Sequence, residues 1–201
     1  MTEAGLLLRS ADVRWARTVV WTTERGARVA GTGLSAPRPP GERLLHRLAV
    51  ADAGIALEAH GYTVFSEREV HAAEAVPGRP AELLEALGVP GVLAGARRGE
   101  TFAVPVGARA VHWPDLVIVE PAPRFPIAVE VELTPKAPAA LQAILRAYRQ
   151  AQRRVLYLAT DPVARQLQGG VVGHLSVRPF TAVDPAVARR ATQQAARLRG
   201  G

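Results

Sequence analysis

Two short stretches decide the fold of this chain: HWPDLVIV at residues 112–119 and PIAVEVELTPK at residues 126–136. Both are rich in β-branched residues, which favour strands, and the proline-rich residues between them predict a turn. In the second stretch the two-residue period of a strand places Glu130, Glu132 and Thr134 on one face and the apolar residues on the other. We therefore expect two strands of one hairpin, with acidic groups and Lys136 at the same end.

Glu130, Glu132 and Lys136 indicate the chemistry of this region. Adjacent carboxylates on a strand repel each other, and a divalent cation or a shared proton relieves that repulsion. Lys136 is the only lysine among 25 basic residues. A lysine ammonium is compact and its pKa shifts readily, whereas an arginine guanidinium is a planar fork. The presence of one lysine among so many arginines therefore favours a specific role for Lys136. The competing interpretation is that Asp115 only ends a turn, and that Glu130 and Glu132 lie on a solvated strand face.

This combination of residues resembles a known nuclease signature. The order Pro114-Asp115, Glu130-Val131-Glu132 and Lys136 is similar to that of the PD-(D/E)xK nucleases. More narrowly, the chain resembles the replication-relaxation proteins of actinobacterial plasmids and integrated elements. The stretches that carry this likeness are LLHRL at 44–48, SERE at 66–69 and the two quoted above. The resemblance implies an α/β fold with an αβββαβ core.

One position departs from the nuclease pattern. Glu132 stands in the slot that usually holds lysine, and Lys136 lies four residues further along the chain. Some restriction endonucleases of this superfamily also carry glutamate in that slot. The departure therefore leaves both a cleaving and a non-cleaving protein open.

The resemblance implies a Mg²⁺-dependent site, with Mn²⁺ as a substitute. Mg²⁺ takes few protein oxygens in octahedral geometry, so Asp115, Glu130 and the Val131 carbonyl would be its metal ligands. Glu132 would bind a second cation or act as general base, and Lys136 would orient the water or stabilise the developing charge. The expected catalytic residues are Asp115, Glu130, Glu132 and Lys136.

Composition narrows the class of protein and partner. The chain has 201 residues, of which 48% are hydrophobic, enough for one principal buried core. Its net charge of +7 indicates an acidic polymer as partner, most economically DNA, although GC-rich coding would produce the same arginine excess. The absence of cysteine excludes disulfides and thiolate metal sites. We find no signal peptide and no apolar run near the about 18 residues of a membrane span, so we expect a cytoplasmic protein without a membrane partner.

Three segments are expected along the chain. Residues 1–35 form a β-rich segment with a turn at Gly26, similar to a remnant of a winged-helix domain; the alternative is a simple hairpin on the core. Residues 36–183 form the nuclease-like α/β domain, entered through a proline-rich linker at 31–41. Residues 184–201 are predicted to form a basic helical tail.

Hydrophobic periodicity predicts the elements of the central domain. Helices are expected at 42–60, 81–87, 138–153 and 162–167, and strands at 62–70, 111–119, 127–134, 154–160 and 171–180. Gly61 stands where a helix C-terminal cap belongs, and Pro138 suits the first turn of a helix. The pattern predicts the αβββαβ order independently of the resemblance, with residues 73–106 as an insertion.

The helix that follows the site is expected to carry Arg146, Arg149 and Arg153 opposite its apolar stripe. Because this helix begins directly after Lys136, its arginines are candidates for contact with a DNA backbone, against the default of a solvated face. Glu67 is expected to be a surface acid paired with arginine. His112 is expected to be a packing or hydrogen-bonding residue.

Three functions are consistent with these observations. The first is a Mg²⁺-dependent DNA endonuclease or nickase that serves replication, relaxation or transfer of a plasmid or mobile element. The second is a DNA-binding accessory protein that keeps the nuclease fold without cutting, and the displaced lysine favours it. The third is an interaction protein whose arginines are compositional. A homodimer stays open as the oligomeric state.

Overall fold

The computed structural model describes residues 7–10, 19–37, 43–89, 101–121, 126–168 and 175–180. Its strands are β1 (Leu7–Ser10), β2 (Val19–Thr22), β3 (Thr63–Ser66), β4 (Val104–Val106), β5 (Ala110–His112), β6 (Leu116–Val119), β7 (Pro126–Glu132), β8 (Val155–Ala159) and β9 (Leu175–Pro179). Its helices are α1 (Glu24–Val29), α2 (Leu44–Ala59), α3 (Glu67–Glu74), α4 (Arg79–Ala86), α5 (Pro138–Gln150) and α6 (Asp161–Gln168). The predicted basic tail at 184–201 lies outside the described residues.

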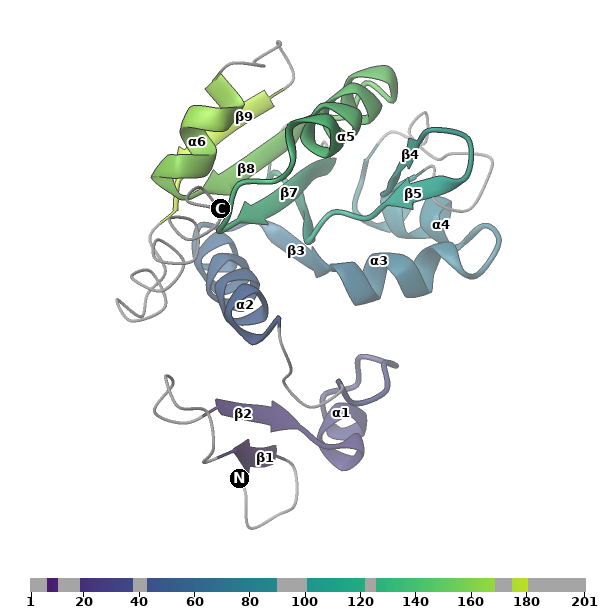
Figure 1. The fold of residues 1–201 in the computed structure, drawn as a ribbon. Coiled ribbons are helices and arrows are strands. Elements are labelled where there is room, and N and C mark those ends of the chain that lie inside the picture. The colour runs from purple at the N-terminus through teal and green to yellow at the C-terminus, as the bar shows by residue number, and fades with distance from the viewer. Residues whose placement is uncertain are drawn as a thin grey trace.

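A five-stranded mixed sheet with strand order β3-β6-β7-β8-β9 forms the centre of the molecule (Figure 1). The β3–β6 and β6–β7 pairs are antiparallel, and the β7–β8 and β8–β9 pairs are parallel. Helices α5 and α6 connect the parallel strands, as parallel neighbours require a crossover. The predicted α/β class is confirmed. The chain follows the order α2-β3-β6-β7-α5-β8, with α3, α4 and a β4–β5 hairpin inserted after β3.

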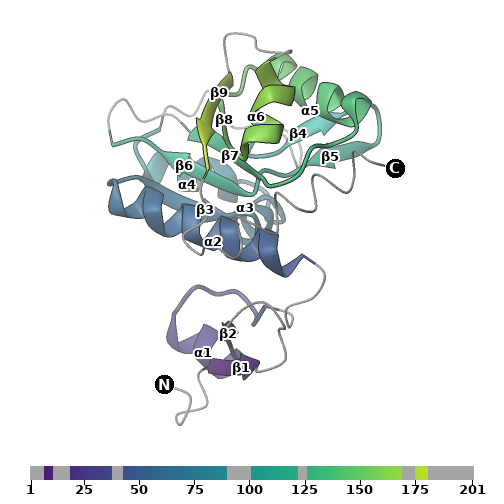
Figure 2. The same cartoon turned by 60° about the vertical axis from the view of Figure 1, so that its left-hand side comes forward.

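Helices cover both faces of this sheet (Figure 2). Helix α2 covers one face through small residues, including Ala49 and Ala53, that contact the apolar side chains of β6 and β7. Helices α5 and α6 cover the other face over β7 and β8, where Tyr148 lies in the core. Helices α3 and α4 cover that face beside β6, with Val70 and Leu84 buried. Strands β6 and β7 are therefore buried along almost their whole length.

The predicted continuous strand at 111–119 is wrong. Strand β5 ends at His112 and pairs with β4, and β6 begins only at Leu116. Pro114 lies between them and is fully buried, but it has no N–H to give to a strand ladder. The chain therefore bends at this point, and Asp115 stands at the entrance to β6.

The predicted strand at 62–70 is too long. Strand β3 ends at Ser66, whose side chain caps α3 by accepting the Glu69 N–H at 3.4 Å. The Glu69 carboxylate accepts the Ser66 N–H in return at 2.7 Å. This is a capping box, whose Ser-x-x-Glu pattern was present in the sequence and marks a helix start.

The N-terminal segment contains the antiparallel pair β1–β2 followed by α1. Thr23 caps α1 by accepting the Gly26 N–H at 3.0 Å. The predicted turn at Gly26 is therefore wrong, because Gly26 lies in the first turn of a helix. Residues 31–37 have no regular structure, as expected for the linker, and Arg68 Nη2 donates to the Ser35 carbonyl at 2.6 Å. In the described part of the chain, no helix has both the length and the apolar character needed to cross a bilayer.

Candidate active site

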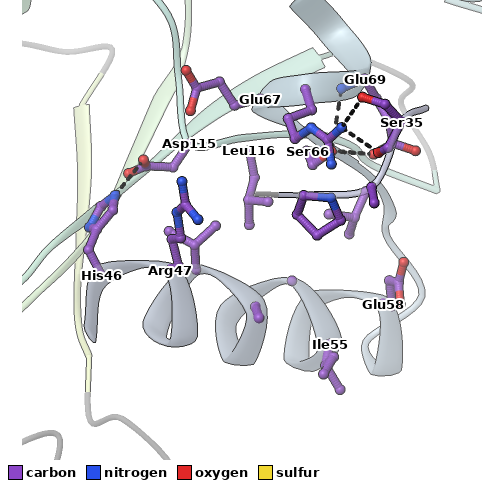
Figure 3. Close-up of a pocket in the computed structure, with 17 residues that line it drawn as sticks. Ser35, His46, Arg47, Ile55, Glu58, Ser66, Glu67, Glu69, Asp115 and Leu116 are labelled. Carbon is purple, nitrogen blue, oxygen red and sulfur yellow. Dashed lines mark hydrogen bonds and ion pairs between the residues drawn. The ribbon is translucent and has the colours of Figure 1, made fainter. Parts of the chain in front are cut away.

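Asp115 joins three elements at the entrance to β6. Its Oδ1 lies 2.8 Å from Nε2 of His46 on α2 (Figure 3), and its Oδ2 accepts the Val131 N–H of β7 at 2.8 Å. The β6–β7 register, continued by one residue, places Asp115 opposite Glu130. The two carboxylates predicted to act together therefore stand on neighbouring strand ends.

Glu130 is buried among hydrogen-bond donors. Only 2% of the residue is exposed, and it accepts the Tyr148 hydroxyl at 2.5 Å and lies 2.7 Å from His112 Nε2. Burial and then the Glu130 charge raise the pKa of Tyr148 well above its ordinary value, so the phenol stays protonated and donates. The interpretation of a solvated strand face is wrong, and the predicted hydrogen-bonding role of His112 is confirmed.

Glu132 is also buried and forms an ion pair with Lys136. Burial lowers the pKa of the Lys136 ammonium, and so does the positive charge of Arg43. The negative charges of Glu130 and Asp115 act in the opposite direction. Desolvation therefore favours loss of the Lys136 proton, whereas the two carboxylates favour the protonated ammonium.

The position of Lys136 is set by α6. The Lys136 N–H donates to Gln166 Oε1 at 3.3 Å, and Gln166 Nε2 donates to the Lys136 carbonyl at 2.6 Å. Thr160 Oγ1 donates to the Leu133 carbonyl at 3.0 Å and holds the same turn from β8. The segment between β7 and α5 is therefore anchored at both ends, which orients Lys136 toward Glu132.

A cavity of about 600 Å³ unites these groups. Its lining includes all four predicted catalytic residues, Asp115, Glu130, Glu132 and Lys136. Basic groups from the N-cap and first turn of α2 and from β5 complete it, namely Arg43, His46 and His112. Glu67 also lines it and is exposed as predicted, but within the residues that the structure describes it has no arginine partner.

Asp115 and Glu130 are the residues of this cavity that could hold a divalent cation. Asp115 and Glu130 offer carboxylate oxygens from neighbouring strand ends, and Mg²⁺ usually takes one or two carboxylates with several waters. The N–H and C=O of one strand residue point to the same edge, so the Val131 carbonyl faces the side on which Asp115 lies. Among the described residues, no three His, Cys, Asp or Glu side chains are grouped to hold a metal, and both carboxylates have protein partners. A cation would compete with His46 and His112.

The predicted DNA-contacting arginines lie away from this cavity. Arg146 and Arg149 are exposed on α5, whereas Ile144 lines the cavity. At about 100° per residue, both arginines lie roughly 140–160° around the helix from Ile144. Arg153 follows the end of α5 and is half-buried, and burial lowers its pKa. The three arginines do not form one exposed face, and DNA contact by Arg146 and Arg149 stays a prediction.

Three residues of the site were missed in the sequence, namely Arg43, His46 and Tyr148. His46 is in the first turn of α2, and nothing local indicates that it meets a carboxylate 69 residues away. Tyr148 is buried on the apolar side of α5, and its hydroxyl donates to Glu130. A signal was present for Tyr148, because a buried tyrosine hydroxyl usually finds a polar partner and two glutamates precede this helix.

Comparisons with known proteins yield no relative: no family model, no curated protein and no solved structure matches the chain. The geometry of the cavity is therefore the basis on which a function is proposed. Its distinguishing features are the paired strand ends, the two buried glutamates and the single lysine.

Tyr148→Phe tests the buried Glu130 contact. We expect it to lower the free energy of unfolding by about 1–3 kcal/mol near pH 7, because a buried acceptor loses its donor. The raised pKa of Tyr148 means that the unfolded chain releases the phenolic proton first, so this stabilisation is present below about pH 10 and is lost as the pH rises further. The free energy of unfolding, measured with urea, should fall less between about pH 8 and pH 11 in the variant than in the wild type.

The control is Tyr62→Phe, since Tyr62 packs in the α2 core on the other face of the sheet. It should leave the alkaline loss of stability unchanged. Equal alkaline losses in wild type and Tyr148→Phe would show that the Tyr148–Glu130 contact does not control this behaviour.

Proposed function

We propose that this chain is a Mg²⁺-dependent DNA endonuclease or nickase with a PD-(D/E)xK-type core, acting in replication or transfer of a plasmid or mobile element. The observation that carries the proposal is the cavity lined by Asp115, Glu130, Glu132 and Lys136 at the ends of two paired strands. The element order of the central domain supports it. So do the basic groups around the cavity, since a phosphodiester is an anion.

The chemistry is hydrolysis, in which a water oxygen bonds to phosphorus, the bond to the leaving oxygen breaks, and the leaving oxygen takes up a proton from solvent water. A bound Mg²⁺, or Mn²⁺ in its place, would supply an activated water and neutralise phosphate charge. Asp115 and Glu130, with the Val131 carbonyl, would hold that cation. Lys136 would stabilise the negative charge that develops on the phosphate oxygens. Glu132 would accept the water proton or hold the ammonium in place through their ion pair.

Tyr148 and His112 act as positioning residues in this scheme. Both contact Oε1 of Glu130, from α5 and β5 respectively. Hydrogen bonds of this kind orient a metal-binding carboxylate and are needed for its geometry. His46 has the same relation to Asp115 from α2.

The second candidate is a DNA-binding accessory protein that does not cut. The observation that favours it is that each carboxylate already has a protein partner, since Asp115 meets His46, Glu130 meets His112, and Glu132 meets Lys136. Such internal pairs relieve the carboxylate repulsion without a cation. The displaced lysine supports the same candidate.

Supercoiled plasmid incubated with Mg²⁺, Mn²⁺ or EDTA distinguishes the two candidates. A nuclease gives open-circular or linear product with either metal and none with EDTA. Protein that binds the plasmid but gives no metal-dependent product would establish the accessory role instead. Absence of both binding and cleavage would leave the interaction-protein interpretation.

Salt dependence tests which arginines meet the phosphate backbone. We expect the logarithm of affinity for duplex DNA to fall with the logarithm of salt concentration, with a slope of about −0.9 per phosphate contact. Because Arg43 lines the cavity, Arg43→Ala should reduce the slope by about one contact. The double change Arg146→Ala and Arg149→Ala should reduce it less, since these residues lie on the far flank of α5. Binding that does not depend on salt would contradict an electrostatic DNA interface.

A further inference from the structure

A second cavity, of about 750 Å³, adjoins the candidate active site. It lies between α2, β3, the start of α3 and residues 35–37 (Figure 3). His46, Glu67 and Asp115 line both cavities, so the two meet at the entrance to β6. A DNA strand whose phosphate lies beside Asp115 would therefore place its next nucleotide at the mouth of this second cavity.

The floor of the second cavity is apolar and is left open by small residues. Val64 and Leu116 supply the sheet side of the floor, and Ala51 and Gly54 face it from α2. A Cβ added at Gly54 would lie in ordinary van der Waals contact with Leu116 Cδ1, at 3.8 Å, so α2 lies close to the sheet at this point. An apolar floor suits the face of a planar ring.

The wall opposite α2 is held in place by hydrogen bonds. Arg68 Nη2 donates to the Ser35 carbonyl at 2.6 Å, and the Ala36 N–H donates to Glu24 Oε1 at 2.9 Å. These contacts tie residues 35–37 to α3 on one side and to α1 on the other. The cavity is therefore bounded by a formed wall as well as by the sheet.

The rim carries polar groups of both signs. Arg47 points from α2 toward the strand end that carries Asp115 (Figure 3), where it would attract a phosphate. Glu58 and Glu67 also line the cavity and are exposed. Carboxylates disfavour a phosphate inside the cavity, but they accept hydrogen bonds from the amino and imino groups of a base. An apolar floor with acceptors at its edge thus matches a nucleobase better than a phosphate.

We propose that the second cavity receives one unstacked nucleobase of the DNA strand whose phosphodiester lies at Asp115. This proposal rests on the proposed function, because it is the candidate active site that places the strand. The volume of the second cavity is within the range of about 300–1,000 Å³ typical of small-ligand pockets. A base inside a duplex reaches such a pocket only after unpairing, which costs a few kcal/mol. Single-stranded or locally opened DNA is therefore the preferred substrate.

The test measures binding in EDTA, so that cleavage plays no part. The probes are a mixed-sequence single-stranded oligonucleotide and an abasic oligonucleotide of the same length. Ala51→Leu adds a bulky side chain on the α2 side of the cavity and should weaken binding of the first probe by roughly tenfold, the scale of one lost base contact. Ala56→Leu is the matched control, because Ala56 is exposed on the same helix and lines neither cavity. The abasic probe should bind wild type and both variants equally.

The outcomes separate this proposal from the nuclease proposal. Equal binding of the first probe by Ala51→Leu, Ala56→Leu and wild type would overturn the base pocket, even if the protein cleaves plasmid. A selective loss in Ala51→Leu would support the pocket, even if the protein cleaves nothing. Weakening of the abasic probe by Ala51→Leu would overturn it as well, because a base would not be needed for the effect. Ala51→Met repeats the test with an unbranched side chain, and thermal unfolding verifies that each variant is folded.

Discussion

Asp115→Asn is expected to reduce metal-dependent nicking of supercoiled DNA by about a thousandfold, while its affinity for DNA stays the same or rises. The loss follows because a metal that polarises the phosphate and activates water contributes several kcal/mol, and the amide is a poor Mg²⁺ ligand. Affinity is retained because the change removes a negative charge beside a bound phosphate. The fold should survive, since an amide oxygen can still accept the Val131 N–H.

The matched control is Glu120→Gln, which removes a carboxylate at the opposite end of β6. Glu120 is paired with Arg154 at 2.9 Å and lines neither cavity. Its replacement should leave nicking unchanged at saturating protein. Unchanged nicking in Asp115→Asn would mean that the catalytic site lies elsewhere in the chain.

Lys136→Ala is expected to lower the nicking rate by roughly a hundredfold, the effect of removing one preorganised charge from a developing oxyanion. Lys136→Arg should restore little, because a planar fork does not occupy the place of a compact ammonium beside Glu132. The measurement is the single-turnover nicking rate at matched, saturating protein.

Loss of Lys136 also leaves Glu132 buried without its ion-pair partner, which lowers stability. The double variant Lys136→Met and Glu132→Gln removes both charges, and it is compared with Glu132→Gln alone, which loses the carboxylate but keeps the ammonium. If the ammonium acts in catalysis, the double variant nicks more slowly than Glu132→Gln, although its stability recovers. A double variant that nicks DNA at the wild-type rate would rule out a catalytic role for Lys136 and leave it a structural one.

The errors in the predicted elements have a common physical cause. The stretch at 112–119 has the composition of one strand, but the missing N–H of Pro114 divides it between two sheets. The stretch at 62–70 is also apolar enough for a strand, but the Ser66 cap starts a helix there. In both cases a single backbone hydrogen bond outweighed the average strand preference of the segment. At Pro114 that hydrogen bond is absent, and at Ser66 it is present.

The candidate site was predictable in part. Side chains alternate on any strand, so the pattern alone indicated that Glu130 and Glu132 share a face. It did not indicate that this face is buried, because burial depends on α5 and on the β4–β5 hairpin, which packs beside it. His112 was expected to form a hydrogen bond, but its partner Glu130 became clear only from the packing.

The sequence by itself determined the α/β class, the order of the core elements and the residues that carry charge at the ends of two adjacent strands. These features follow from local periodicity, from helix signals such as Pro138 and Gly61, and from residue identity. Only the tertiary structure decided that Asp115 meets His46, that Glu130 meets Tyr148, and that a second cavity adjoins the first. Contacts of this kind depend on how helices pack across a sheet. The residues involved are far apart in the sequence, so no local pattern indicates that they meet.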